Sequence, residues 1–263
     1  MTLPETDDER YDLVAVAPHP DDLEITCGGT LAQLVRQGYR IAIIDLTTGE
    51  PTPRGSEEIR AKEAEEARAV LGVHKRISLK LPNRVLMDSP EHRFRLGTEL
   101  RRLRPKIVLT TAGRTPAASP DHHQGHLLVE ASRFYSQLTK WDDRFDGTSP
   151  YRVPHLVYAP FPFDAEQRNW HGSFIIDITE TIEQKMAAIA CYRSQFDEAR
   201  LARVRHFITG ASVYHGSRCG FMHGEFFALP HPIGNSDLIT VVLGGKGSPA
   251  PVQLPGKDHL PMG

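Results

Sequence analysis

Cysteine is scarce in this sequence of 263 residues, which has only Cys27, Cys191 and Cys219. The count is odd and the three residues lie far apart, which argues against a disulfide framework. No two of them have the C-x-x-C spacing that is typical of a structural zinc site. The cysteine usage therefore predicts a protein of a reducing compartment, the cytoplasm.

Long apolar runs are also lacking. No stretch approaches the ~20 apolar residues that are needed to span a bilayer. Residues 1–12 are polar and acidic, without the basic and apolar regions of a signal peptide. The 31 basic and 33 acidic side chains give a formal charge of −2 and are dispersed along the chain. The composition therefore predicts neither a membrane nor a nucleic-acid partner.

The hydrophobic content of 40% is enough for one sizeable core. Apolar runs that suit buried strands alternate with amphipathic segments, which predicts an α/β fold with a mostly parallel, doubly wound sheet. Ser56 begins the second helix with a capping box, and Gly72 ends it. The predicted strands cover residues 12–18, 40–47, 76–79, 107–110, 156–159 and 173–178, and the predicted helices cover residues 28–37, 56–71, 92–104, 180–196 and 198–213.

A polar turn at residues 18–24 follows the first predicted strand and holds one imidazole beside two adjacent carboxylates. Open parallel sheets bind ligands at such strand-to-helix turns. His19 and Asp22 are three residues apart, so both can face one metal ion while Asp21 points elsewhere. Catalytic zinc sites typically have three protein ligands and an open position, so a third ligand is expected elsewhere. The alternative is that the two aspartates simply cap the next helix.

The same turn lacks the G-x-G-x-x-G pattern of dinucleotide-binding proteins. Its two carboxylates would also repel a pyrophosphate. A dinucleotide-dependent oxidoreductase, which the α/β pattern alone would allow, is therefore set aside.

A second cluster of imidazoles follows the strand predicted at residues 107–110. Here Asp121 is followed by His122, His123 and His126. Loops at the carboxyl ends of strands in one parallel sheet can face each other across a cleft, so this loop can supply the third ligand. The spacing leaves the choice among the three histidines open. The alternative is a helix cap at Asp121 with exposed histidines.

Residues 14–29 carry an H-P-D-D-x-E signature followed by two glycines, and the sequence resembles the PIG-L/LmbE-like zinc-dependent N-acetylglucosaminyl deacetylases. The likeness covers roughly residues 11–227 and looks especially like the bacillithiol-pathway branch. It implies a single Rossmann-like, three-layer domain with C-terminal helices. The resemblance also rests on further short motifs: Arg60 with Glu63, Asp121-His122, Asp177-Ile178-Thr179, residues 192–196 and residues 220–222.

The resemblance implies that His19, Asp22 and His122 bind Zn²⁺, with Fe²⁺ as the alternative metal. It implies Asp21 as the general base, which takes a proton from a metal-bound water. The expected function is that of an amide hydrolase that removes acetyl from an N-acetylglucosaminyl conjugate or a related small N-acetyl substrate. Family resemblance also implies a homo-oligomer, either a trimer or a hexamer.

The sequence departs from the family pattern at Ser119, where relatives have a histidine that assists at the oxyanion or the leaving amine. Serine donates a hydrogen bond but carries no positive charge. We expect His123 or His126 to supply the missing imidazole. The alternative function is a catalytically impaired or repurposed, metal-containing sugar-binding protein. Two further departures, at Cys219 and Asn83, concern the substrate pocket.

Three residues are candidate substrate contacts: Arg60, Arg152 and Ser119. The two arginines match basic positions that face the sugar or its aglycone in relatives. For Arg60 the alternative is a surface ion pair with Glu63 or Glu57.

The domain organisation is predicted as one domain between two short extensions. Residues 1–10 are expected to be an N-terminal extension, and residues 11–243 the deacetylase domain. Residues 244–263 follow a Gly- and Pro-rich stretch and are expected to be a flexible tail.

Overall fold

A computed structural model describes residues 10–116, 118–162, 172–232, 234 and 236. The chain divides into two compact units, residues 1–230 and residues 231–263, and the fold below is that of the first unit. The predicted extension, apart from residue 10, and the predicted tail and its boundary lie outside the described residues. In the described part of the chain, no helix is both long enough and apolar enough to cross a membrane.

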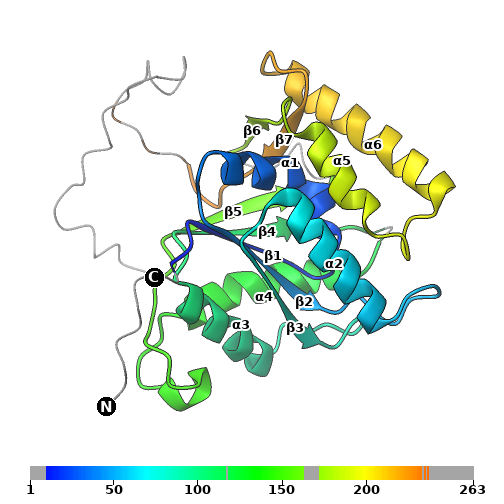
Figure 1. Cartoon of the computed structure of the whole chain (residues 1–263). Helices are drawn as coiled ribbons and strands as arrows, with labels where there is room; N and C mark the ends of the chain where they lie inside the picture. Colours follow the sequence, from blue (N-terminus) through cyan, green and yellow to red (C-terminus); the bar gives the residue numbers. More distant parts are fainter. Residues whose placement is uncertain (1–9, 117, 163–171, 233, 235, 237–263) are drawn as a thin grey trace. The chain divides into compact units, whose positions relative to one another are not determined.

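The first unit is built on a parallel sheet of five strands in the order β3-β2-β1-β4-β5 (Figure 1). Strands β1 and β2 are buried along their whole length, as expected where helices cover both faces of a sheet. The predicted α/β class with a mostly parallel sheet is confirmed. The strands are β1 (Leu13–Ala17), β2 (Ile41–Thr47), β3 (Lys75–Leu81), β4 (Ile107–Ala112) and β5 (His155–Pro160).

Helices pack on both faces of this sheet and create two cores (Figure 1). Successive residues of β1 face opposite cores, Leu13 and Ala15 one of them, Val14 and Val16 the other. The first core includes α1 (Asp22–Arg36), α2 (Glu57–Leu71), α5 (Ile182–Ala190) and α6 (Glu198–Ser217), and the second includes α3 (Pro90–Leu103) and α4 (Asp121–Tyr135). A short 3₁₀ helix, η2 (Asp142–Phe145), follows α4.

Local capping explains where α2 begins and ends. The Ser56 hydroxyl accepts a hydrogen bond from the Ile59 backbone N–H at 3.3 Å. Gly72 has a φ of 76°, the left-handed conformation that glycine adopts without a steric penalty. Both predicted ends of this helix are confirmed.

Helix α1 begins at Asp22, earlier than the predicted start at residue 28, and bends at Cys27, where φ is −141°. The two glycines after the bend allow close packing. A Cβ on Gly29 would lie 2.9 Å from the side chain of Ile178, so only glycine fits there without a shift. The early start places the polar turn directly against the first turn of the helix.

A second, antiparallel sheet consists of β6 (Phe174–Asp177) and β7 (Gly224–Phe227). The sequence predicts β6 but not β7, which is only four residues long and pairs with a strand distant in the chain. The predicted helix at residues 180–196 is shorter in the structure, where α5 ends at Ala190 and turns follow it.

Strand β7 secures the bend of α1 through Glu225. Its carboxylate accepts hydrogen bonds from the backbone N–H groups of Gly29 at 3.0 Å and Thr30 at 2.7 Å. The ammonium of Lys185 lies 2.5 Å from the same carboxylate, and both side chains are 3% exposed. Glu225 thus satisfies two backbone donors that the bend would otherwise leave without partners.

We expect Glu225→Gln to lower the free energy of unfolding by about 3–5 kcal/mol, because it leaves the Lys185 charge buried and unpaired. The corresponding fall in Tm is roughly 10 °C for a chain of this size. The matched control is Glu183→Gln. Glu183 pairs with Arg205 at the surface and is 76% exposed, so its loss should cost less than about 1 kcal/mol. Equal losses in urea unfolding for the two variants would contradict the role of Glu225.

Candidate metal centre

The turn after β1 lies at the carboxyl edge of the main sheet, next to the loop after β4. β1 and β4 are hydrogen-bonded neighbours in parallel register, so both loops leave the sheet at the same edge. Within the first loop, Asp21 has a φ of 113°, a left-handed conformation that non-glycine residues rarely adopt. The backbone of the turn is therefore strained at the residue between the two candidate ligands.

Three donors converge where the two loops meet. His19, Asp22 and His122 each place a ligand atom within 4.8 Å of the others. The Nδ1 atom of His19 is 3.2 Å from one Asp22 oxygen, and the Nε2 atom of His122 is 3.4 Å from the other. Of the three histidines that the spacing left open as third ligand, His122 is the one that lies in this group. Two imidazoles and a carboxylate suit zinc or another first-row divalent metal.

Asp121 orients His19 from outside the group. One oxygen of this buried carboxylate lies 3.2 Å from Nε2 of His19, which leaves Nδ1 to face Asp22. The same carboxylate accepts hydrogen bonds from the backbone N–H groups of Arg84 at 2.6 Å and Leu86 at 3.3 Å. Asp121 is therefore not a simple helix cap, and that alternative is wrong. The sequence offered only its position next to His122 as a signal.

Thr115 and Phe161 fix the orientation of His122. The Thr115 hydroxyl lies 2.8 Å from Nδ1 of the imidazole, so Nε2 faces the group. The Phe161 ring stacks on the imidazole with a centroid distance of 4.3 Å. His122 is 7% exposed, which excludes the alternative of an exposed histidine. Neither supporting residue was predicted, because both reach the site through tertiary packing.

The charges around the group favour a bound cation. The pKa of Asp22 lies below its usual range, because the two histidines outweigh the effect of burial. Burial lowers the pKa of His19, but the surrounding aspartates have the larger combined effect and raise the pKa to about 10. A metal ion would take the place of the proton that His19 then holds. Among the described residues, this network of ion pairs joins five carboxylates, those of Asp21, Asp22, Glu24, Asp45 and Asp121, to the guanidinium groups of Arg60 and Arg76.

Asp21 lies beside the group and is not one of its members. Its carboxylate faces Arg60, with 3.1 Å between Oδ2 and Nη2. Burial raises the pKa of Asp21 to about 6, with a further contribution from Asp22, while Arg60 opposes the rise. The alternative that this pair of aspartates caps α1 is wrong, since the Asp21 side chain makes no cap hydrogen bond and Asp22 faces the histidines.

Arg60 is buried, with 3% of its surface exposed, so it is not a helix-surface ion pair. Glu63, one of its two proposed surface partners, accepts hydrogen bonds from the backbone N–H and the hydroxyl of Ser194 instead. The Arg60 guanidinium lies over the ring of Tyr192 at 5.4 Å. Its position beside Asp21 keeps it a candidate for contact with a ligand.

Ser119, which replaces the family's histidine, and the nearby His123 and His126 have different surroundings. Ser119 accepts a hydrogen bond from the Asp121 backbone N–H at 3.3 Å and is half-buried. His126 lies 3.7 Å from Glu130 and next to the ring of Tyr158, and burial lowers its pKa. The ring of His123 lies 6.4 Å from that of His126. That His123 or His126 supplies the missing imidazole stays a prediction.

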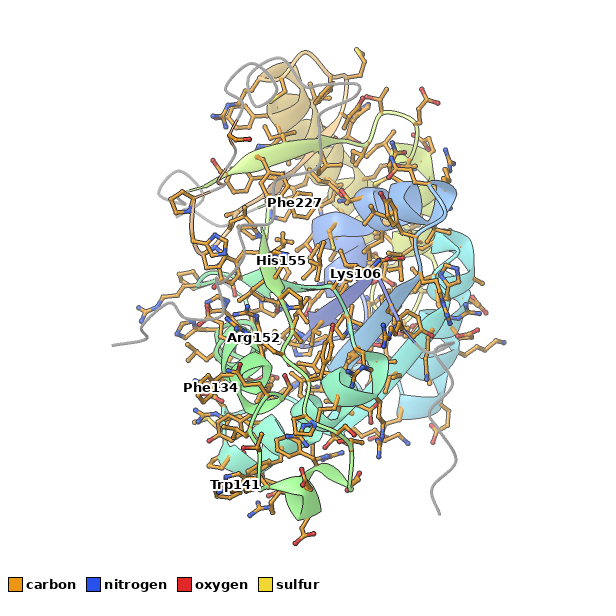
Figure 2. The ribbon with its side chains drawn as sticks, turned by 90° about the vertical axis from the view of Figure 1, so that its left-hand side faces the viewer. Lys106, Phe134, Trp141, Arg152, His155 and Phe227 are labelled. Carbon is orange, nitrogen blue, oxygen red and sulfur yellow. The ribbon has the colours of Figure 1, made fainter. Side chains whose placement is uncertain are left out.

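Arg152 lies away from the metal group. It precedes β5, whose first residue, His155, pairs with the first residue of β4. Arg152 therefore lies at the amino edge of the sheet, near Lys106 and His155 (Figure 2). The parallel strands thus place Arg152 at the opposite edge of the sheet from His19. That Arg152 contacts a substrate stays a prediction.

Asn83 and Cys219, the two other departures from the family pattern, lie in different parts of the structure. Asn83 lies at the carboxyl edge, where the Thr47 hydroxyl donates to its side-chain oxygen at 3.4 Å. Cys219 is exposed, after the end of α6. Of these two residues, Asn83 is thus the one that lies at the same edge of the sheet as the metal group.

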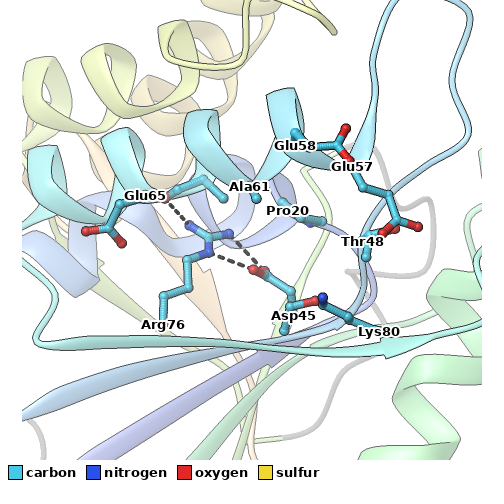
Figure 3. A pocket seen from close by; sticks show the side chains of 11 residues that line it. Pro20, Asp45, Thr48, Glu57, Glu58, Ala61, Glu65, Arg76 and Lys80 are labelled. Atoms are coloured by element: carbon cyan, nitrogen blue, oxygen red, sulfur yellow. Dashed lines mark hydrogen bonds and ion pairs between the residues drawn. The ribbon is translucent and has the colours of Figure 1, made fainter.

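A cavity of about 340 Å³ lies beside the turn, between α2 and strands β2 and β3 (Figure 3). Arg76 reaches across it to Asp45, and the side chains of Glu57 and Glu58 line its α2 side. Pro20 lines the cavity on the side of the turn. The cavity therefore adjoins the metal group through the backbone of the turn.

Fold and site together define an α/β protein with a group that could hold a metal ion at the carboxyl edge of its parallel sheet. Residues 14–132 match the PIG-L family, described as GlcNAc-PI de-N-acetylase. The conserved protein TT1542 from Thermus thermophilus is 34% identical in sequence, with a TM-score of 0.73, and the match covers 86% of this chain and 97% of that chain. The chain belongs to the PIG-L family.

Two further relatives carry different reaction names. Diacetylchitobiose deacetylase from Thermococcus kodakarensis is 28% identical over 81% of this chain and 80% of its own length. 4-Oxalmesaconate hydratase from Pseudomonas putida is 26% identical over 69% of this chain and 73% of its own length. Similarity to these relatives alone therefore leaves two reaction classes to consider.

We expect Asp121→Asn to weaken zinc binding by about 10–100-fold, because His19 loses the carboxylate that orients it. His122→Ala should abolish binding, whereas His126→Ala should retain it. Competition with a chromogenic chelator measures all three affinities. The control is Asp88→Asn, which removes a carboxylate that pairs with Arg93. Loss of zinc with His126→Ala and not with His122→Ala would reassign the third ligand.

Proposed function

We propose that the protein is a metal-dependent hydrolase that removes acetyl from an N-acetylglucosaminyl conjugate or a related small N-acetyl compound. The observation that carries the proposal is the buried group of His19, Asp22 and His122 with a separate carboxylate, Asp21, beside it. Water adds to the acetamide carbonyl and the C–N bond breaks, which yields acetate and a free amine. The deacetylase relative supports this reaction class.

His19, Asp22 and His122 would hold the metal, with Zn²⁺ as our first choice and Fe²⁺ as the alternative. When bound, such a metal lowers the pKa of water and polarises a carbonyl oxygen. Asp121 and Thr115 keep the two imidazoles turned toward the metal.

Asp21 is our candidate for the general base. Its carboxylate takes a proton from the water that attacks the carbonyl carbon, and the same proton can then pass to the leaving nitrogen. Two features suit this role: Asp21 is adjacent to Asp22 in the chain, and it does not belong to the ligand group. A carboxylate that bound the metal would lose much of its basicity.

Arg60 and Ser119 are our candidates for substrate contacts. Among the residues described, the buried Nε and Nη1 atoms of Arg60 have no hydrogen-bond partner, so the N–H groups of these two nitrogens remain for a ligand oxygen. Ser119 lies just before α4, close in the chain to the ligand His122, and can donate its hydroxyl hydrogen. His123 or His126 would act at the oxyanion or the leaving amine.

The predictions of a cytoplasmic protein and of a trimer or hexamer remain part of this proposal, as does the bacillithiol-pathway branch. Two alternatives compete with it. One is a metal-containing sugar-binding protein that lost catalysis with the histidine replaced by Ser119. The other is a hydratase, which the Pseudomonas putida relative favours.

We expect zinc-loaded protein to release acetate from at least one N-acetylglucosaminyl conjugate in a screen. Asp21→Asn should lower kcat by about 10²–10⁴-fold, the usual contribution of a general base, and should keep its zinc. Asp12→Asn is the control, because Asp12 pairs with Lys106 at the amino edge of the sheet. Acetate assays and elemental analysis measure the two quantities.

The double variant His123→Ala/His126→Ala tests the missing imidazole. Full turnover in this variant would contradict our assignment of either histidine. Zinc binding without any acetate release would favour the sugar-binding alternative. Water addition to an unsaturated dicarboxylate in a parallel assay would favour the hydratase.

A further inference from the structure

We propose that Arg60 is a positioning residue that holds the Asp21 carboxylate away from the metal group. The inference rests on the proposed function, because it assigns Asp21 the role of a base that must not become a ligand. It concerns the resting protein, before any substrate binds.

Two adjacent carboxylates, Asp21 and Asp22, stand next to one three-donor group. A carboxylate so close to a divalent cation is an obvious additional ligand, because a zinc site with three protein ligands and a water can expand to five ligands. The structure nevertheless places Asp21 outside the group. Its backbone is strained, with φ of 113° and ψ of −26°, so the conformation persists only if neighbouring contacts enforce it.

Arg60 makes those contacts with a single nitrogen. Nη2 lies 3.1 Å from Oδ2 of Asp21 and also donates a hydrogen bond to the backbone carbonyl of Pro20. One buried guanidinium thus binds both the side chain of Asp21 and the peptide group before it. Rotation of Asp21 toward the metal would break the ion pair in a site that water reaches poorly.

The guanidinium is itself held on two sides. The ring of Tyr192 lies beneath it, and the Tyr192 hydroxyl donates to Glu24 at 2.9 Å. Gly49 covers it from another side, where a Cβ would lie 3.3 Å from Cζ and Nε of Arg60. Gly49 also has a φ of 74°, which favours glycine. Arg60 therefore has little freedom to release Asp21.

A residue that only contacts substrate would leave the resting metal site unchanged when it is removed. Removal of a residue that holds Asp21 away from the metal would instead change the resting metal site. Cobalt(II) in place of zinc distinguishes the two, because four-coordinate cobalt absorbs visible light more strongly than five- or six-coordinate cobalt.

The experiment compares visible spectra of the cobalt-loaded protein without substrate. With three protein ligands and one water in the resting protein, entry of Asp21 as a further ligand in Arg60→Ala should raise the coordination number and weaken the absorption severalfold. Asp21→Asn in the Arg60→Ala background should restore the stronger spectrum. Lys62→Ala, which removes an exposed positive charge from the same helix, should match the unaltered protein.

Arg60→Lys and Arg60→Gln accompany the alanine variant, because a buried arginine can be needed for folding, and circular dichroism identifies folded variants. Arg60→Lys keeps one donor and should show an intermediate spectrum. In zinc-loaded protein with a substrate that is turned over, kcat should fall by about 10²-fold in Arg60→Ala, as expected when a catalytic group is misplaced. Loss of a substrate contact alone would raise KM at constant kcat.

An unchanged cobalt spectrum in folded Arg60→Ala or Arg60→Gln would overturn the inference about Arg60 alone. Failure of the unaltered protein to bind cobalt or zinc would overturn it together with the metal centre. Absence of deacetylation would overturn the proposed reaction but leave the spectral test of Arg60 intact.

Discussion

Buried charge beneath the first turn of α1 is the constraint on which the rest of the site depends. Arg76 of β3 binds Asp45 of β2 through two hydrogen bonds of 2.7 and 2.8 Å, and it binds Glu24 of α1 at 2.6 Å. Tyr192 donates to the same Glu24 oxygen. A buried charge of this kind is tolerated only while its partner is present. The turn that carries His19 is therefore tied to two strands and to the segment after α5.

The order of the strands determines where the metal group forms. The chain runs outward from β1 through β2 to β3 and then returns to place β4 on the other side of β1. The connections after β1 and β4 diverge at this reversal, which is the place where open α/β sheets bind ligands. His19 and Asp22 come from the first loop and His122 from the second. Neither loop supplies three donors to the group, so the site exists only in the folded chain.

The sequence predicts well what depends on neighbours along the chain. Apolar runs give the buried strands, Ser56 marks the start of α2, and the spacing of His19 and Asp22 requires only one turn of backbone. Partners that approach from distant segments leave no such trace. Asp121 contacts His19 from the start of α4, and Glu225 contacts the bend of α1 from β7. The choice of one histidine from three likewise depends on how α4 packs against β4, which no spacing encodes.

Residues beside the metal group, rather than its three members, would distinguish deacetylation from hydration. The relatives include both a deacetylase and a hydratase, so one family scaffold accompanies two reactions. Both reactions need a base for water, which we assign to Asp21. They differ in the acid, because amide cleavage delivers a proton to nitrogen and hydration delivers one to carbon. Ser119 stands where the family pattern has a histidine that assists at the oxyanion or the leaving amine, and a serine hydroxyl is too weakly acidic to replace an imidazolium there. In the function that we propose, the reaction therefore depends on whether His123 or His126 of α4 reaches the substrate.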